Sequence, residues 1–336
     1  MKKWNIEPFV ALAPHLSGAA FDNVARRAFD ENRWFTPENI RSAAGAICSR
    51  MLDGGNLNRW LSAYEKPADF RPRRVGIVMA GNIPMVGFAD LLAVLVSGHS
   101  ATVKLSSKDR VLMGYIVECL AALGCDVETA QSIDRYDVDA VIATGSNSSR
   151  NRFAELFAGL PSLLRGDRFS AAVLQGDQTP KQLEGLWDDM FRYGGLGCRS
   201  VSRLYFPRGY DIGKFAGVMK SFADKSDSKE FADCYRYAKT IRTMNGEEFM
   251  DGGYFLMVPA NGDIQPGIAE VEYICYENDR QLNHMLAEDF SSFQCVVANP
   301  AVDIDFAGIV GFGQSQNPAL DDYADGVDTM RFLLGL

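Results

Sequence analysis

The chain has 336 residues, of which 47% are hydrophobic and 23% are charged, as in an ordinary globular protein with a large core. Its net charge of -9 and the lack of a basic tract argue against nucleic acid as a partner. Seven cysteines without CxxC or Cys/His spacing predict neither a disulfide framework nor a metal site, so a reducing, cytoplasmic location is expected. No apolar segment with a cleavage site opens the chain, and no secretory signal is expected.

Strands and helices alternate along the first half of the chain. Residues 1–70 are expected to be mostly helical, with one helix that begins at Thr36-Pro37. Short apolar runs predict buried strands at 74–80, 101–105 and 138–143. Helices are expected at 90–98, 110–123 and from about 149. This alternation predicts a parallel, doubly wound sheet.

The second half predicts a further α/β unit. Strands are expected at 170–174, 204–206, 254–258, 270–276 and 294–298, with a helix at 181–193. The apolar stretch 75–98 has the length of a membrane span, but Gly81, Asn82 and Pro84 interrupt it. We therefore expect a strand, a turn and a helix there, and no membrane span.

Three loops follow predicted strands at the edge where doubly wound sheets bind ligands, at 81–84, 104–107 and 144–147. None carries a GxGxxG or GxxxxGK[ST] motif, so a dinucleotide would have to bind by another route. Gly145 and Ser146 could offer backbone N–H groups to a pyrophosphate, or could form an ordinary helix cap. Lys104 with Ser106 could hold a ribose or its 2′-phosphate, or Lys104 could be a solvated edge residue.

Asn82 and Cys198 are the candidates for chemistry. Asn82 lies in an apolar loop, where a buried amide needs partners; it could brace its turn or donate to an oxyanion. Cys198 follows Gly194, Gly195 and Gly197, which would let a substrate approach the sulfur closely. Cys198 is therefore either a nucleophile, which requires the thiolate, or a small core residue.

Four strings occur in the order used by the aldehyde dehydrogenase superfamily, which the chain resembles from about residue 70 onward. They are Gly81-Asn82-Ile83-Pro84, Val103-Lys104, Thr144-Gly145-Ser146 and Gly197-Cys198-Arg199. Within that superfamily the segments 81–87, 104–109, 196–199 and the tail 311–328 are similar to those of LuxC-type acyl-CoA reductases. The resemblance implies an α/β, aldehyde-dehydrogenase-like fold, with a doubly wound Rossmann-type cofactor domain and a second α/β catalytic domain.

The resemblance also implies how the chain is divided and which residues act. The expected domains are a helical N-terminus with the nucleotide-binding domain at 1–176, a catalytic cysteine domain at 177–310, and a tail at 311–336 that packs near the active site. By position, Cys198 would be the nucleophile, and Asn82 would donate to the oxyanion together with the Cys198 backbone N–H.

The implied cofactor is NADPH, with NADH as the alternative. Lys104, followed by Ser106, matches the lysine that contacts the adenine ribose. Gly145 and Ser146 match the turn beside the pyrophosphate. A glutamate contacts the nicotinamide ribose in the superfamily, but the motif around Glu270 and Glu272 is absent here, so neither is assigned that role.

Two positions depart from the superfamily pattern. Arg150 stands where the pyrophosphate turn usually has a second glycine. Val173 stands where aldehyde-oxidising members carry a glutamate that activates water to hydrolyse the acyl-enzyme. The absence of that glutamate favours exchange of the acyl group with thiols.

The sequence therefore predicts NAD(P)H-dependent reduction of an acyl thioester, carried by CoA or by an acyl-carrier protein, to an aldehyde through an acyl-Cys198 intermediate. One alternative is an aldehyde dehydrogenase that oxidises aldehydes with a different base. The other is a catalytically silent binding protein on the same fold. By analogy with the superfamily, a homo-oligomer, either a dimer or a tetramer, is expected.

Overall fold

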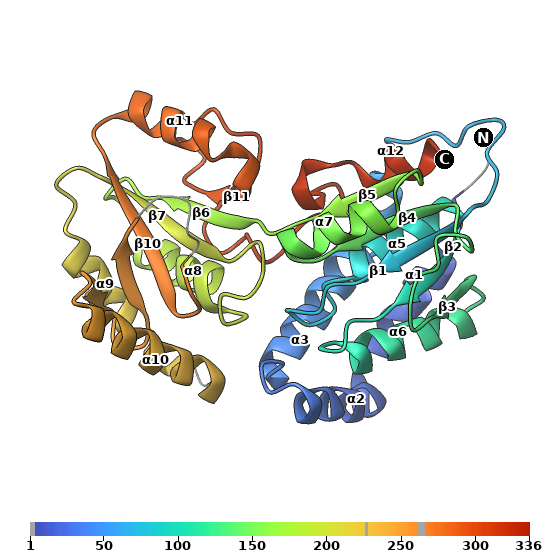
Figure 1. Ribbon diagram of the computed structural model, residues 1–336, viewed down its shortest axis with the longest axis horizontal. Coiled ribbons are helices and arrows are strands. Elements are labelled where there is room, and N and C mark those ends of the chain that lie inside the picture. Colours follow the sequence, from blue (N-terminus) through green and yellow to red (C-terminus); the bar gives the residue numbers. More distant parts are fainter. Residues whose placement is uncertain (1–3, 226–227, 261–265) are drawn as a thin grey trace. The chain divides into compact units, whose positions relative to one another are not determined.

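The computed structural model describes residues 4–225, 228–260 and 266–336. The chain forms two compact units, Met1–Asp167 with Pro318–Leu336, and Arg168–Asn317 (Figure 1). The first unit therefore ends before the boundary expected at 176. The physical reason is that the strand at Phe169–Val173 pairs with strands of the second unit.

The first unit contains a parallel sheet whose strand order among the described residues is β3-β2-β1-β4-β5. The strands are β1 (Arg74–Val78), β2 (Ser100–Lys104), β3 (Val127–Thr129), β4 (Ala140–Thr144) and β5 (Ser162–Arg165). The order runs outward in both directions from the neighbours β1 and β4, which is the doubly wound arrangement predicted from the sequence. Ligands in such sheets bind at the carboxyl ends of the strands beside this reversal point.

Helices surround this sheet, and capping residues mark the ends of some of them. The helices of the first unit are α1 (Glu7–Leu12), α2 (Gly18–Glu31), α3 (Pro37–Ala46), α4 (Gly54–Leu61), α5 (Phe88–Ser97), α6 (Arg110–Ala122), α7 (Asn147–Leu156) and α12 (Thr329–Leu334). The Thr36 side chain accepts from Asn39 N, which confirms the predicted start of α3. Helix α5 ends at Gly98, whose φ of 96° is left-handed and therefore suits glycine.

The last residues of the chain belong to the first unit. Helix α12 packs against α5, and Nε2 of His99 lies 2.8 Å from the carbonyl oxygen of Leu333. Arg165, at the end of β5, donates to Asp90 of α5 at 2.5 Å and to the Thr329 hydroxyl at 2.9 Å. A buried guanidinium thus joins a central helix, an edge strand and the C-terminal helix.

The second unit contains a sheet with the order β12-β11-β6-β7-β10-β9-β8 among the described residues. Its strands are β6 (Phe169–Val173), β7 (Val201–Pro207), β8 (Met250–Asp251), β9 (Leu256–Pro259), β10 (Glu270–Tyr276), β11 (Phe293–Val297) and β12 (Ile309–Val310). All pairings are parallel except that between β8 and β9. The helices are α8 (Pro180–Phe191), α9 (Ile212–Lys220), α10 (Lys229–Asn245) and α11 (Asp279–Glu288).

Both faces of the second sheet are covered, because neighbouring residues of a strand point to opposite faces. Tyr205 of β7 is buried in a cluster with Leu282 and Leu286 of α11. The next residue, Phe206, places its ring 5.2 Å from that of Phe215 of α9. In neither unit is any described helix both long and apolar enough to cross a membrane.

We expect Asp90→Ala to lower the free energy of unfolding by about 3 kcal/mol, because it removes the Asp90 carboxylate from its ion pair with the buried Arg165 guanidinium. The two side chains are only 16% and 4% exposed, so water cannot replace the lost partner well. Urea unfolding followed by circular dichroism measures the change. Asp69→Ala, at an exposed aspartate, is the control and should change the value by less than about 0.5 kcal/mol. Equal effects of the two substitutions would contradict the assignment.

Candidate active site

Cys198 lies in a tight turn between α8 and β7. Gly194 and Gly195 adopt left-handed backbone angles, with φ of 65° and 72°, which side chains other than glycine rarely allow. Backbone bonds close the turn, from Gly194 N to the Phe191 carbonyl at 2.9 Å and from Ser200 N to the Gly197 carbonyl at 2.9 Å. The cysteine is half-buried and is not in a disulfide. The turn therefore presents a thiol with partial access to solvent.

Ser170 of the neighbouring strand β6 forms a hydrogen bond with the backbone of this turn. The Ser170 hydroxyl of β6 donates to the carbonyl oxygen of Cys198 at 2.9 Å and accepts from Cys295 N at 3.3 Å. Ser170 has no exposed surface. Since β6 lies between β7 and β11, the bond ties the Cys198 backbone to the middle of the sheet. No pattern in the sequence indicates this role, because Ser170 is one residue of a predicted strand.

A buried carboxylate joins α8 to the segment 311–317. Asp189 accepts from Gly313 N at 2.6 Å, and from the backbone N–H and the hydroxyl of Ser315 at 2.9 and 2.8 Å. The Gln316 amide then donates to the Asp189 carbonyl and to the Ser200 hydroxyl. Burial raises the pKa of Asp189 to about 6, which outweighs the hydrogen bonds that lower it. The segment 311–317 thus contacts the turn two residues after Cys198.

Asn82 lies half-buried in the loop between β1 and α5. This loop contacts the loop that follows β2 at two points. A Cβ on Gly81 would lie 2.5 Å from the Ser106 hydroxyl oxygen, so only glycine fits there. Met85 N donates to Oδ2 of Asp109 at 2.7 Å. The candidate oxyanion donor and the candidate cofactor residues are therefore on loops that pack directly together.

Asp109 is 2% exposed, and burial raises the pKa of its carboxyl to about 8, although the hydrogen bond from Met85 lowers it. Within the described residues its Oδ1 has no hydrogen-bond partner. A buried carboxylate with one partner is unfavourable when ionised, so the group keeps its proton near neutral pH. Sequence reasoning missed this residue.

The predicted cofactor residues share one edge of the first sheet. Lys104 ends β2 and Ser106 follows it, both half-buried, while Gly145 and Ser146 follow β4. Since β2, β1 and β4 are neighbours, these loops emerge beside the Asn82 loop. Cys198 belongs to the second unit.

Ser146 is the N-cap residue of helix α7. The Ser146 side chain accepts from Ser149 N at 3.3 Å, and helix α7 begins at Asn147 rather than near residue 149. Asn147 N donates to a carboxylate oxygen of Asp167 at 2.8 Å, and Asp167 N donates back to the Asn147 side chain. A pyrophosphate at this turn would therefore compete with a carboxylate that already occupies the positive end of the helix dipole. Arg150 is exposed in the first turn of the same helix.

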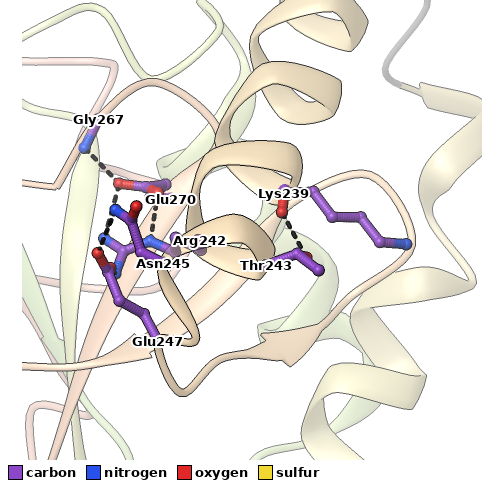
Figure 2. Close-up of polar contacts among 7 residues, drawn as sticks. All are labelled: Lys239, Arg242, Thr243, Asn245, Glu247, Gly267 and Glu270. Carbon is purple, nitrogen blue, oxygen red and sulfur yellow. Dashed lines mark hydrogen bonds and ion pairs between the residues drawn. The ribbon is translucent and has the colours of Figure 1, made fainter.

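The two glutamates near the predicted strand 270–276 have structural partners. Figure 2 shows Glu270 between Arg242 of α10 and the backbone N–H of Gly267. Nε of Arg242 donates to Oε1 of Glu270 at 2.5 Å, and Gly267 N donates to Oε2 at 2.9 Å. Burial alone would raise the pKa of Glu270, but these partners hold it below its usual value. Glu272 accepts from buried Arg203 at 2.9 Å, and burial raises its pKa despite this pairing. Both carboxylates are engaged within the second unit.

No protein-family model and no curated protein sequence matches the chain. Solved structures do. An oxidoreductase from Marinobacter aquaeolei is 16% identical with a TM-score of 0.68, covering 95% of this chain and 80% of that one. Aldehyde dehydrogenase 21 from Physcomitrella patens, in complex with succinate, is 13% identical with a TM-score of 0.64, covering 98% and 87%.

A third similar structure is NADP-dependent glyceraldehyde-3-phosphate dehydrogenase from Bacillus halodurans, complexed with NADP. It is 14% identical with a TM-score of 0.61, covering 90% of this chain and 77% of that one. At these identities the likeness concerns the fold. It confirms the predicted class, an α/β protein with the fold of the aldehyde dehydrogenases.

Asp109→Asn tests the buried carboxyl through stability. The folded chain holds a proton on Asp109 up to about pH 8, whereas the unfolded chain releases it near 3.8. The free energy of unfolding of the native chain should therefore fall as pH rises between these values and then level off. The asparagine variant lacks this loss, which amounts to about 1.4 kcal/mol per pH unit at most.

Urea unfolding from pH 4.5 to 9 measures the difference between the two proteins. We expect the variant to gain stability relative to the native chain as pH rises to about 8. Stability curves that run parallel across this range would show that Asp109 titrates normally.

Proposed function

We propose that the chain is an NADPH-dependent reductase that converts an acyl thioester into an aldehyde through an acyl-Cys198 intermediate. The observation that carries the proposal is Val173, an apolar side chain with no exposed surface at the position where the sequence resemblance places the water-activating glutamate. Val173 packs in the core of the second unit. An acyl-cysteine without a base for water at that position favours transfer of the acyl group over its hydrolysis.

The first unit fits the cofactor in part. The half-buried Lys104 at the end of β2 supplies a cation, which suits the 2′-phosphate and favours NADPH over NADH. There is no space for a Cβ at Gly81 beside Ser106, so the loop backbone packs directly against the Ser106 side chain at this edge of the sheet. The capped turn at Ser146 fits less well because of Asp167. NADPH, when bound, supplies the hydride that reduces the acyl group.

Acyl transfer to the enzyme is the first half of the proposed reaction. The Cys198 thiolate forms a bond to the thioester carbon, and the carbonyl electrons move onto oxygen. The Asn82 amide and the Cys198 backbone N–H donate to this oxyanion; removal of one such donor typically lowers the rate about 10²–10³-fold. The oxyanion then collapses and the bond to the carrier sulfur breaks. The departing thiolate takes a proton from solvent.

Reduction releases the product. Hydride addition to the acyl carbon gives a hemithioacetal oxyanion on Cys198, held by the same two donors. Its collapse breaks the carbon–sulfur bond, releases the aldehyde and returns the thiolate. The acyl group is thereby reduced, the cofactor is oxidised, and one proton is consumed by the carrier thiol.

Aldehyde oxidation is the second candidate, and the fold shared with aldehyde dehydrogenases supports it. In that direction an aldehyde would add to Cys198, hydride would pass to NAD(P)⁺ to leave an acyl-cysteine, and water would hydrolyse the acyl-cysteine to a carboxylic acid. This route requires a base other than the residue at position 173. A catalytically silent binding protein is the remaining alternative, and it predicts a Cys198 thiol without enhanced reactivity.

The decisive experiment mixes the protein with NADPH and a panel of acyl-CoAs and acyl-carrier proteins, and follows nicotinamide absorbance and trapped aldehyde. We expect thioester-dependent loss of NADPH with equimolar aldehyde. Cys198→Ala should abolish it, whereas Cys275→Ala, at the exposed cysteine of β10, should leave it intact. Acid formation from aldehyde and NADP⁺ without CoA would favour the dehydrogenase. Turnover in neither direction, with a slowly reacting Cys198, would favour the binding protein.

Asp167→Asn tests the capped turn of α7. The substitution removes a negative charge while keeping an acceptor for Asn147 N. We expect the dissociation constant for NADPH, measured by fluorescence titration, to fall about three- to tenfold, because the helix dipole no longer faces a carboxylate.

The matched control is Glu155→Gln, which removes an exposed carboxylate near the other end of the same helix. Its dissociation constant should stay within about twofold of the native value, since the dipole effect is confined to the terminal turns. Equal values for the native chain and Asp167→Asn would show that the pyrophosphate does not approach this turn.

A further inference from the structure

Asp109 stands at the position that normally caps a helix, yet it does not cap α6. Its side chain accepts no bond from the first turn of that helix. Instead Oδ2 accepts from Met85 N at 2.7 Å, in the loop between β1 and α5. The carboxyl is 2% exposed, so the bond is shielded from water. Asp109 therefore lies at the N-cap position of α6 but forms its hydrogen bond with the loop between β1 and α5.

The backbone at Met85 needs such a partner. Its φ of 57° is left-handed, which is unfavourable for a residue with a side chain. The Met85 side chain is 2% exposed, so packing also fixes it in place. Four residues earlier, Gly81 lies against Ser106 and the Cβ of Asp109, since a Cβ on Gly81 would lie 2.5 and 3.1 Å from their atoms. Asn82 lies between these two fixed points.

We propose that Asp109 is a positioning residue for Asn82, which it holds in place by binding the strained backbone of Met85. The inference rests on the proposed function, because it gives Asn82 the role of oxyanion donor. Asp109 itself touches neither substrate nor cofactor in this scheme. Its effect is to fix where the Asn82 amide points.

The same residue links two parts of the site. Asp109 ends the loop that begins at Lys104 and includes Ser106. A change in that loop on cofactor binding would reach Asn82 through the Asp109–Met85 bond and through the contact between Ser106 and Gly81. The Asp109–Met85 bond therefore joins the loop of the candidate cofactor residues to the loop of the candidate oxyanion donor.

Two substitutions separate the hydrogen bond from the space that the side chain fills. Asp109→Leu keeps the branched shape of the side chain, with two bulkier methyl groups, and removes the acceptor, whereas Asp109→Asn keeps both the size and the acceptor. We expect Asp109→Leu to lower kcat about 10- to 100-fold, as expected when a catalytic group is misplaced, with KM for NADPH within about threefold of the native value. Asp109→Asn should restore kcat to within about threefold. Asn82→Ala calibrates the full loss of the donor.

A glycine at position 85 provides a second arm. Asp109→Leu combined with Met85→Gly should recover at least about fivefold in kcat over Asp109→Leu alone, because glycine adopts the left-handed angle without strain. A global loss of stability would not be reversed by this change. If the leucine variant does not fold, Asp109→Ala takes its place, since it also removes the acceptor.

Hydrogen exchange measured by mass spectrometry on residues 80–88 tests the inference without any enzymatic assay. We expect exchange to rise at least about tenfold in Asp109→Leu and to stay near native in Asp109→Asn. If the native chain shows no turnover, the proposed function fails while this arm still reports on Asp109. The inference would be overturned if residues 80–88 of Asp109→Leu exchanged at the native rate. It would also be overturned if Asp109→Leu and Asp109→Asn raised the exchange rate equally.

Discussion

Two buried carboxylates each accept backbone N–H groups from an irregular segment, one from the loop of Asn82 and one from the segment 311–317. Asp109 binds Met85 N beside Asn82, and Asp189 binds Gly313 N and Ser315 N in the segment that contacts Ser200. In each case burial raises the pKa more than the hydrogen bonds lower it. The folded chain therefore tolerates an unfavourable environment for two acids, and in return two irregular loops each have a fixed anchor.

Left-handed backbone angles occur both in the loop of Asn82 and in the turn of Cys198. Met85 has a left-handed angle that a side chain disfavours, and Gly194 and Gly195 have angles that glycine permits. Strain of this kind persists only where surrounding contacts determine the conformation. Here those contacts come from neighbouring strands and from residues distant in the chain. Such preorganisation is what a reaction through an oxyanion requires, because donors must be in place before charge develops.

Much of the fold follows from local patterns in the sequence, whereas its anchors do not. Short apolar runs predict the central strands, whereas β3, β5, β8 and β12 have only two to four residues and show no such run. Cys198, Asn82 and Lys104 lie in glycine-rich or strand-end contexts, which are visible in the sequence. Their positioning partners gave no such signal. Asp109 resembles a helix cap, and its partner Met85 lies 24 residues away.

Ser170 and Asp189 illustrate the same limit. Ser170 contacts Cys198, 28 residues along the chain, and Asp189 contacts residues more than 120 positions away. Spacing within one element cannot reveal such pairs, because only the sheet order and the return of the chain bring them together. Roles that depend on tertiary contacts thus remain invisible until the topology is known.

The second unit is inserted into the first, since the chain leaves the first unit after Asp167 and re-enters it at Pro318. During synthesis, the second unit can fold as soon as residue 317 has emerged from the ribosome. The first unit must wait for α12, which packs against α5 and meets His99 through the carbonyl of Leu333. The first unit is therefore begun first and completed last. The surface of α5 that α12 covers stays exposed while the roughly 150 residues of the second unit are synthesised. During that time chaperone binding and aggregation compete with folding.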